Sequence, residues 1–337
     1  MSDLGIDLHT NSLTVCYRTR QGKERVCTFA LKDLDAFCKT LRKRDRVAVE
    51  ATGNTRWFVQ QIRQRVKKVI VVNPNKFEVI TKSVRKTDKH DAKTLAYFLS
   101  KDMLPKARMK DEKTAQLHSL AETRDKLVKQ RTALLNKIHN VLNSHGITLK
   151  KESLGTQKGL DTIWSWDWPV VVEVELKVLV CQIQQLTKSI KQLDEELSVR
   201  GRRLKGHANL CSIKGIGAKS ATVLLSVIGA VKDFESEHKL AAYFGIVPRV
   251  SNSNETQHHG RITKRGSKLG RTTLVQCTLV AKRYSPYLRR FYERIKVRRG
   301  SGKAIIATAR KFLGIIYNTL VNDWLFKDFP NFVLVKS

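Results

Sequence analysis

Acidic residues, long apolar runs and paired cysteines are all scarce in this sequence, and each scarcity excludes a class of protein. No apolar run approaches the ~20 residues that a helix needs to cross a bilayer. The N-terminus lacks the basic region and apolar segment of a signal peptide, so we expect a cytosolic protein. The six cysteines show no Cys-x-x-Cys or Cys/His spacing, which predicts reduced thiols rather than disulfides or a zinc site. There is also no Gly-x-x-x-x-Gly-Lys nucleotide-binding loop.

The shortage of acidic residues leaves a net charge of +34, from 64 Lys and Arg against 30 Asp and Glu. Residues 258–337 are especially basic, with 18 Lys and Arg against 3 Asp and Glu. An apolar fraction of 41% argues against a disordered basic tail. No single helix concentrates positive charge opposite a wide apolar face, as membrane-binding helices do. The composition therefore predicts a nucleic-acid partner and no membrane, although a ribosomal or chromatin-like scaffold would be equally basic.

Two short apolar runs each carry one carboxylate away from their most apolar face. Residues 4–8 alternate with Asp7 on the second face, and residues 46–51 alternate with Glu50 in the same position. Charges are depleted in strands that are buried, so each of these carboxylates calls for a partner or a metal.

A third segment with candidate carboxylates, Lys86–Ala92, follows the strand expected at 69–72. It opens a helical pattern that runs to about Ser100. Asp88 and Asp91 are three residues apart and therefore share one face of that helix. A solvated helix start, in which Asp offsets the helix dipole, would account for this pair by itself.

Together, these four carboxylates form an Asp-Glu-Asp-Asp set: Asp7, Glu50, Asp88 and Asp91. Mg²⁺ prefers oxygen ligands of this kind, and Mn²⁺ is a possible substitute. A pair of such cations about 3.5–4 Å apart can clamp a phosphodiester during transfer. The set predicts a metal site that handles phosphodiesters.

The 337 residues allow two or three domains. Within residues 1–105 we expect three strands in a meander, the first carrying Asp7, followed by alternating helices and strands. This is the order of an α/β RNase H-like domain, in which the first and fourth strands are neighbours. Such a fold would bring Asp7 and Glu50 together.

Residues 106–205 predict a long α-helical, coiled-coil arm. Two apolar seams, within 117–141 and 176–197, repeat with spacings of three and four. Arg124 and Arg131 interrupt the first seam. Two interpretations stay open: the arginines extend past the partner helix, or they face a phosphate backbone. Three tryptophans within 164–168 could stack on bases or form a packing cluster.

Residues 206–337 predict an all-α domain that begins with a helix-hairpin-helix. Gly215 and Gly217 would form its tight turn, with Lys219 at the start of the next helix. The free amides at such a helix start suit a DNA phosphate without reading base sequence. The remaining chain predicts helices at 271–282, 287–297 and 303–320.

Three blocks carry a family resemblance. Gly5–His9, Val49–Gly53 and Lys86–Ala92 resemble, in order, the motifs of the DEDD transposases of the insertion-sequence family one-ten. The first domain of that family is similar to the RuvC Holliday-junction resolvase, and Piv-type DNA invertases are relatives. Gly245–Ser253 and Gly260–Ser267 resemble the family's second conserved domain, so the resemblance covers nearly the whole chain.

The resemblance implies a serine nucleophile that joins covalently to DNA. By its position after Pro248 the match is Ser253, and Ser251 in the same polar loop is the alternative. A serine hydroxyl is a poor nucleophile without a base or metal, so the Asp-Glu-Asp-Asp site and the serine must meet. Lys264, Arg265 and Arg271 are candidate phosphate clamps.

The resemblance also implies an RNA-guided transposase or recombinase that acts on donor and target DNA. Its guide would be a noncoding bridge RNA, and it would act in the prokaryotic cytosol at the nucleoid. Because recombination needs two DNA duplexes handled together and the two apolar seams can also pair between chains, we expect a dimer through residues 110–200 and a tetramer on DNA. The alternatives are a RuvC-like metal-dependent nuclease specific for DNA structure, a Piv-type invertase without a guide RNA, and a non-catalytic nucleic-acid scaffold. The expected domains are 1–105 (catalytic), 106–205 (helical arm) and 206–337 (helix-hairpin-helix and serine loop).

Overall fold

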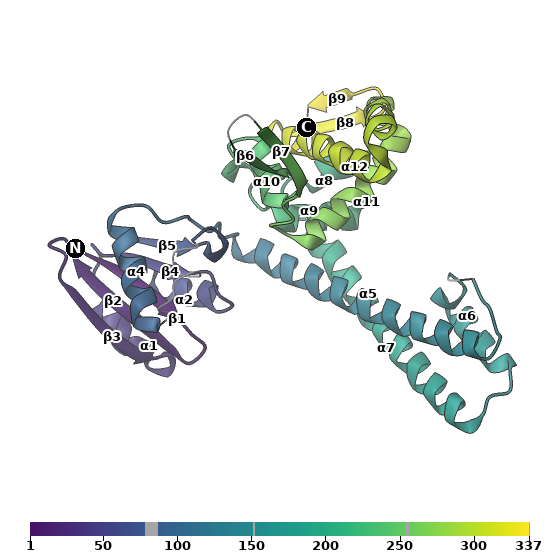
Figure 1. Cartoon of the computed structure of the whole chain (residues 1–337), viewed down its shortest axis with the longest axis horizontal. Coiled ribbons are helices and arrows are strands. Elements are labelled where there is room, and N and C mark those ends of the chain that lie inside the picture. The colour runs from purple at the N-terminus through teal and green to yellow at the C-terminus, as the bar shows by residue number, and fades with distance from the viewer. Residues whose placement is uncertain (78–86, 151, 254–255, 337) are drawn as a thin grey trace. The chain divides into compact units, whose positions relative to one another are not determined.

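The computed structural model describes residues 1–77, 87–150, 152–253 and 256–336. Lys86, the first residue of the segment Lys86–Ala92, lies outside the described residues. The chain forms two compact units, Met1–Met109 and Lys110–Ser337, and each is described by itself (Figure 1).

The first unit is built on a five-stranded sheet with the order β3-β2-β1-β4-β5. The first three strands pair antiparallel, and β4 and β5 run parallel to β1. The alternation of apolar residues expected from the sequence is present in β1, where Leu4, Ile6 and Leu8 are buried. The strands are β1 (Ser2–Leu8), β2 (Ser12–Thr19), β3 (Glu24–Ala30), β4 (Arg46–Glu50) and β5 (Lys68–Val72).

Helices contribute to the core on both faces of this sheet. On one face, Leu4 and Ile6 of β1 share a core with Phe37 and Phe58. Phe37 comes from α1 (Leu34–Thr40) and Phe58 from α2 (Thr55–Ile62), and short 3₁₀ turns lie at Leu31–Asp33 and Pro74–Lys76. On the other face lies α4 (Asp88–Ser100) (Figure 1), whose Leu95 joins a core with Ala48 of β4.

Gly5 allows α4 to lie unusually close to the sheet. A Cβ atom at this position would stand 2.1 Å from the carbonyl oxygen of Ala92 and 2.3 Å from the amide nitrogen of Ala96. The helix offers small side chains at both positions, and both alanines are fully buried. The close approach brings the start of α4 against the edge where β1 ends.

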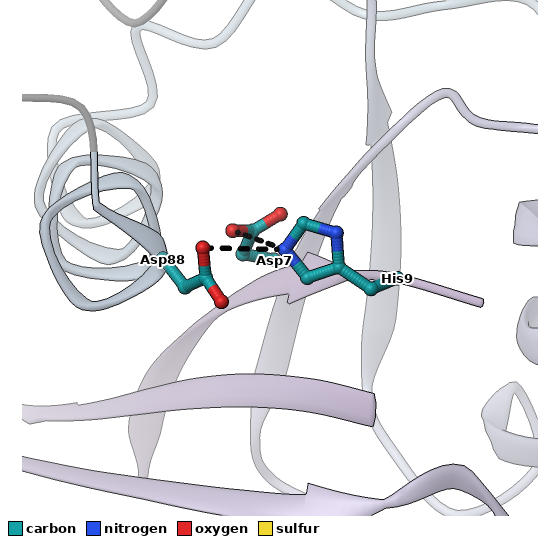
Figure 2. Close-up of side chains that lie close together, drawn as sticks. All are labelled: Asp7, His9 and Asp88. Atoms are coloured by element: carbon teal, nitrogen blue, oxygen red, sulfur yellow. Dashed lines mark hydrogen bonds and ion pairs between the residues drawn. The ribbon is translucent and has the colours of Figure 1, made fainter. Parts of the chain in front are cut away.

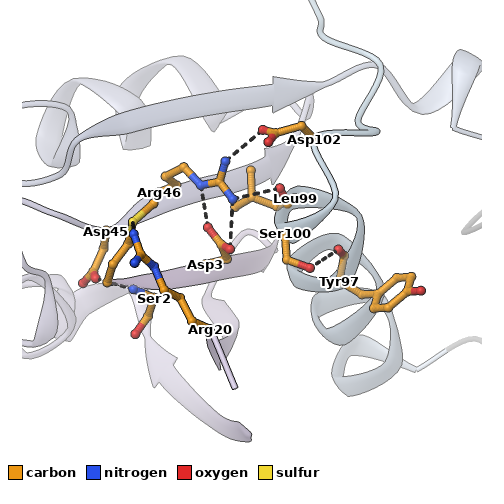
Figure 3. Close-up of polar contacts among 10 residues, drawn as sticks. Ser2, Asp3, Arg20, Asp45, Arg46, Tyr97, Leu99, Ser100 and Asp102 are labelled. Atoms are coloured by element: carbon orange, nitrogen blue, oxygen red, sulfur yellow. Dashed lines mark hydrogen bonds and ion pairs between the residues drawn. The ribbon is translucent and has the colours of Figure 1, made fainter. Parts of the chain in front are cut away.

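An ion-pair network holds the other end of α4 (Figure 3). Arg46 of β4 donates from Nε to Asp3 Oδ1 at 2.6 Å and from Nη1 to Asp102 Oδ1 at 2.8 Å. Its Nη2 also donates to the carbonyl oxygen of Leu99 at 3.2 Å, within the last turn of α4. Because Asp3, Gly5 and Asp7 alternate along β1, the same face of one strand fixes the helix and carries the first carboxylate.

The second unit begins with two long helices that pack side by side (Figure 1), α5 (Glu112–Ser144) and α7 (Val170–Gly201). Their apolar seams meet in the distal half around Ile138, Leu142, Leu176 and Ile183. The tip between them holds η3 (Ser153–Gly155), α6 (Gln157–Asp161) and η4 (Thr162–Ser165).

The predicted tryptophan cluster lies at this tip. Trp166 and Trp168 are half-buried against the arm's core, and Trp168 Nε1 donates to the carbonyl oxygen of Ile163 at 2.8 Å. The Trp166 and Trp168 rings meet edge to face with centroids 6.3 Å apart. These contacts support the packing interpretation for both residues, whereas Trp164 is 41% exposed.

The arm joins the rest of the second unit at a tightly packed root. Gly201 at the end of α7 lies so close to α9 (Ala218–Ile228) that a Cβ there would stand 1.9 Å from Thr222 Oγ1. Leu117 and Leu197 of the two arm helices share a core with Val223 of α9. The root is therefore a three-helix junction.

The globular part of the second unit is mainly helical. Its core includes the fully buried Phe244 and Phe312 together with the nearly buried Phe329. Besides α9, its helices are α8 (His207–Cys211), α10 (Glu237–Phe244), α11 (Lys268–Tyr284) and α12 (Pro286–Val321), with a 3₁₀ turn at Val231–Asp233. Gly300 interrupts α12 with a φ of 77°, so the element is two helices joined at a bend.

The prediction that residues 206–337 are all α is wrong, because two β-hairpins accompany the helices. They are β6 (Pro248–Ser253) with β7 (Thr256–Ile262), and β8 (Trp324–Asp328) with β9 (Val333–Lys336). The first hairpin is rich in Asn, Ser, His and Gln, so it lacks the apolar alternation that marks a half-buried strand. The second uses very short strands, where periodicity carries little information.

Among the described residues, one helix is long and apolar enough to cross a membrane by length and composition alone. Within α12, an 18-residue window has a mean hydropathy of 1.3, and 44% of it is buried in the unit. The sequence expectation concerned an uninterrupted apolar run, and this part of α12 contains the charged residues Arg310 and Lys311. Its apolar residues include Ala309, Phe312, Leu313 and Ile316, which belong to the core of the unit, so internal packing accounts for the apolar character.

Candidate functional site

The sheet topology brings the first two predicted carboxylates to one edge. Asp7 is the last residue but one of β1, and Glu50 is the last residue of β4. The parallel pairing aligns Ile6 with Val49, so Asp7 and Glu50 are the next residues along the two strands. Ala48, two residues before Glu50, packs with Leu95 of α4, and alternation therefore places Glu50 on the face that α4 covers.

The start of α4 supplies the other two carboxylates. Thr87 caps the helix with an extended backbone, and its Oγ1 accepts a hydrogen bond from the amide of His90 at 3.3 Å. The cap makes Asp88 the first helical residue and places Asp91 one turn later. Asp88 is exposed, with 57% of its side chain accessible, whereas Asp91 is buried, with 7% of the residue accessible. The pair therefore offers one carboxylate to solvent and one to the interior.

Three of the carboxylates act on one another electrostatically. Burial raises the pKa of Asp7 above its ordinary value, and the negative charges of Asp88 and Asp91 raise it further. His9 opposes both effects with its own charge and with a hydrogen bond to Asp7. Negative charge is thus concentrated at the edge where β1 ends and α4 begins.

His9 is a residue of this site that the sequence interpretation did not include. Its Nε2 lies 3.2 Å from Asp7 Oδ2 and 3.4 Å from Asp88 Oδ1 (Figure 2). One ligand atom from each of the three residues lies within 4.8 Å of the other two. The missed signal was spacing, because His9 follows Asp7 by two residues and an extended chain places such residues on one side.

The predicted serines lie in a strand rather than in a loop. Ser253 is the last residue of β6 and pairs with Thr256 across the hairpin, while Ser251 pairs with His258. The serines belong to the second unit and the four carboxylates to the first.

Two of the predicted nucleic-acid contacts share one carboxylate inside the second unit. Arg124 Nε lies 2.9 Å from Asp194 Oδ1, and Lys219 Nζ lies 2.6 Å from Asp194 Oδ2. Burial alone would raise the pKa of Asp194, but the hydrogen bonds and charges of Arg124 and Lys219 outweigh it and lower the pKa below its ordinary value. The three residues come from α5, α7 and α9, so this cluster ties the two arm helices to the start of α9.

Two further predicted arginines also contact protein groups. Arg271 Nη1 donates to the carbonyl oxygens of Phe244 at 3.1 Å and Gly266 at 3.0 Å, and burial lowers the pKa of its guanidinium. Arg131 Nη1 donates to Thr187 Oγ1 at 3.4 Å across the arm.

The remaining predicted nucleic-acid contacts lie in turns. Gly215 has a φ of 106° and packs against α11, where a Cβ would stand 2.6 Å from the amide nitrogen of Ala281. Gly217 is the N-cap of α9, and a Cβ atom at this position would meet nothing within 4 Å. Lys264 has a φ of 54° and precedes Arg265 in the turn between β7 and α11.

Comparison with known proteins gives a consistent result along the chain. Residues 4–147 match the model of the DEDD transposases of the IS110 type, and residues 207–293 match the model of the transposase IS116/IS110/IS902 family. The transposase for insertion sequence element IS1111A of Coxiella burnetii is 26% identical over 288 residues, which are 82% of this chain and 78% of that protein. The pilin gene-inverting protein of Moraxella lacunata is 27% identical over 338 residues, covering 93% of this chain and 94% of its own.

Proposed function

This chain belongs to the IS110 family of DEDD transposases, and from that premise we propose that it is an RNA-guided DNA recombinase with a divalent-metal site and a serine nucleophile. The sequence resemblance to this family is confirmed, and with it a transposase or recombinase function that acts on DNA. The observation that best supports the finer proposal is the meeting of Asp7 and Glu50 at one sheet edge, with Asp88 and Asp91 at the start of the helix that covers it.

The first unit is proposed to be an RNase H-like, RuvC-like catalytic domain. An antiparallel β1–β3 meander followed by parallel β4 and β5 supports this assignment, as does the order β3-β2-β1-β4-β5. Residues 1–105 would form the catalytic domain, 106–205 the coiled-coil arm and 206–337 the domain with the helix-hairpin-helix and the serine.

The donor set fits a hard divalent cation. Asp7, Glu50, Asp88 and Asp91 offer oxygen ligands. Burial raises the pKa of Asp7, and repulsion from Asp88 and Asp91 raises it further; a bound cation would offset both effects. When bound, Mg²⁺ or Mn²⁺ would polarise a phosphodiester and favour the deprotonated form of an attacking hydroxyl. The half-buried Asp7 and buried Asp91 would fix the position of the ligand set, while exposed Asp88 meets the substrate side.

The chemistry proposed for Ser253 is a transesterification. Its hydroxyl oxygen forms a bond to phosphorus, the serine proton is lost, and the bond from phosphorus to a deoxyribose oxygen breaks, with that oxygen taking up a proton. The reverse reaction joins a new strand end. Phosphodiester energy is conserved, so strand exchange needs no ATP, in agreement with a sequence without the Gly-x-x-x-x-Gly-Lys loop.

Specificity is proposed to come from a noncoding bridge RNA that pairs with donor and target DNA. The net charge of +34 supports backbone binding to both kinds of nucleic acid, and backbone contacts do not specify sequence. Lys264, Arg265 and the amides around Gly215 and Gly217 are the proposed phosphate contacts. Arg124, Arg131, Lys219 and Arg271 hold protein groups and would have to exchange partners to bind phosphate.

A covalent adduct assay tests this proposal. Full-length protein is incubated with Mg²⁺ and DNA that carries the ends of its insertion sequence, with and without the bridge RNA. The products are then separated on a denaturing gel. We expect a protein–DNA adduct only with RNA, lost in Ser253→Ala and kept in Ser251→Ala. An adduct lost in Ser251→Ala instead would move the nucleophile by two residues. Free 3′ hydroxyl ends without an adduct would indicate a RuvC-like nuclease, and binding without cleavage would indicate a scaffold.

A DNA invertase without a guide RNA is the second candidate. Its support is the match to the pilin gene-inverting protein of Moraxella lacunata over 93% of this chain. The same assay separates the two, because an invertase of this kind would form its adduct and recombine inverted sites in reactions treated with ribonuclease.

A further inference from the structure

We propose that His9 is a nitrogen ligand of the metal site, which would make the site a mixed oxygen–nitrogen centre rather than one built from carboxylates alone. This inference rests on the proposed metal function of Asp7, Glu50, Asp88 and Asp91, and it adds a residue outside that set.

The backbone of His9 is fixed from two directions. Its amide donates to the carbonyl oxygen of Ser12 at 2.9 Å within the β1–β2 turn. Its own carbonyl oxygen accepts a hydrogen bond from Asn54 Nδ2 at 2.9 Å. Asn54 is held in turn by Thr52, whose Oγ1 donates to Asn54 Oδ1 at 2.9 Å. The loop that follows Glu50 therefore clamps the turn that carries His9, and both lie at the edge where the carboxylates meet.

The imidazole is placed as a ligand would be. Nε2 is 3.2 Å from Asp7 Oδ2 and 3.4 Å from Asp88 Oδ1, so a single ring nitrogen faces two carboxylate oxygens from two different elements (Figure 2). Neighbouring ligands of an octahedral cation with bonds of about 2.1 Å are separated by roughly 3 Å. The three ligand atoms need only small shifts to surround one ion, which would take the place of a proton between Nε2 and the carboxylates.

A packing role does not account for this side chain. The His9 side chain is 49% exposed, beside the 57% exposed Asp88. It therefore stands on the solvent side of the cluster, where an ion with an open coordination position for a phosphate oxygen would lie.

A nitrogen ligand changes which cation the site prefers. Mg²⁺ and Mn²⁺ are both commonly held by oxygen donors, but Mn²⁺, as a first-row transition metal ion, accepts an imidazole nitrogen more readily than Mg²⁺ does. We therefore expect the site to favour Mn²⁺ over Mg²⁺ by a margin that depends on His9.

Electron spin-echo envelope modulation on the Mn²⁺-loaded full-length protein is the direct test. Wild-type protein should show modulation from a coordinated ¹⁴N nucleus, and growth with ¹⁵N-labelled histidine should replace that signal with a ¹⁵N one. This comparison requires no variant, so it does not depend on any substitution folding. Mn²⁺ bound without histidine modulation would overturn the inference and leave the carboxylate site intact.

Substitution and calorimetry supply the second measurement. His9→Gln should weaken Mn²⁺ binding roughly 10- to 100-fold, the range seen when even an outer-shell partner of a metal ligand is removed, and weaken Mg²⁺ binding less. His90→Gln, an exposed histidine at the start of α4, is the matched control and should bind Mn²⁺ like wild type. Equal losses for both metals in His9→Gln would reduce His9 to an ion-pair partner. Equal, negligible Mn²⁺ binding by wild type and Asp7→Asn would refute the metal site itself.

Discussion

The four carboxylates of the candidate site differ in their surroundings more than their shared chemistry suggests. Asp91 is buried, Asp7 and Glu50 are intermediate and Asp88 is exposed. A buried charge needs compensation from its environment. Removing one of the three less exposed carboxylates should therefore change the electrostatics of the metal site. Asp88, by contrast, borders the solvent from which substrate arrives.

At the residue scale, Asp7→Asn and Asp91→Asn should each lower recombination by at least about 100-fold, the loss typical when one preorganised charge-stabilising group is removed. Asparagine keeps the shape of the side chain, so the melting temperature and nucleic-acid binding should stay close to wild type. Recombination between plasmid-borne sites is the measurement. The control is Asp35→Asn, an exposed acidic residue of α1. Near wild-type recombination in either site variant would remove that residue from the proposed metal set.

Much of this site could be predicted from the sequence, because each carboxylate lies within a local pattern. Asp7 and Glu50 interrupt alternating apolar runs, and Asp88 and Asp91 have helical spacing. His9 could not be assigned in this way, because it lies one residue beyond the end of β1 and outside the alternating run. The partners of Arg124 and Lys219 could not be predicted, since Asp194 lies 70 and 25 residues away from them and nothing local marks the pairing.

At the scale of elements, the helices were easier to predict than the hairpins. The paired arm helices follow from apolar seams repeated over many turns, and the sheet follows from strands of alternating residues. The β6–β7 and β8–β9 hairpins carry no comparable pattern. The contact between α4 and β1 is also an element-scale property, because a single glycine sets how closely the two approach.

Gly5→Ala tests that contact. The added methyl group would overlap Ala92 and Ala96, so α4 must shift, and overpacking of this kind costs about 1–3 kcal/mol. The shift would also displace Asp88 and Asp91, so we expect recombination to fall with the melting temperature. Gly53→Ala in the same unit is the matched control for stability, because its Cβ would meet nothing within 4 Å. Equal melting temperatures for the two variants would contradict the close-approach argument.

The junction at Asp194 gives a prediction about pH. The folded-state pKa of Asp194 is lowered, so its contribution to stability is fully present above the unfolded pKa of about 3.9 and is lost as pH falls through the folded value. Asp194→Asn should destabilise the protein by about 1 kcal/mol at pH 7. The difference from wild type in thermal melts should shrink below about pH 4.

Glu196→Gln serves as the comparison for this junction. It removes an exposed i,i+4 pair with Arg200 on the same helix and should cost only a few tenths of a kcal/mol. A loss in Asp194→Asn that is no larger would show that the junction contributes no more than a surface pair.

For the whole molecule, recombination requires two duplexes to be handled together, and this leads us to expect a dimer through residues 110–200 and a tetramer on DNA. Val171, Val174 and Val178 support a seam of this kind. They are 81%, 57% and 57% exposed and follow one another on α7 with spacings of three and four, as at a helix–helix interface.

Light scattering on Val174→Gln/Val178→Gln should give a monomer where wild type gives a dimer. Val199→Gln is the control, because this residue is 58% exposed near the far end of the same helix. A wild-type mass that corresponds to one chain, both with and without nucleic acid, would refute the oligomer prediction.

The packed root of the arm has a mechanical consequence. Because α7 and α9 meet without space for a methyl group at Gly201, and α5 packs beside them through Leu117, we expect the helical pair to move as one lever about its root. A helix of 33 residues is about 50 Å long. A rotation of about 10° at the root would move the tip by roughly 9 Å, which is more than two base-pair steps of duplex DNA at 3.4 Å each. The angle at which the three helices pack at the root therefore determines the position of whatever the tip binds.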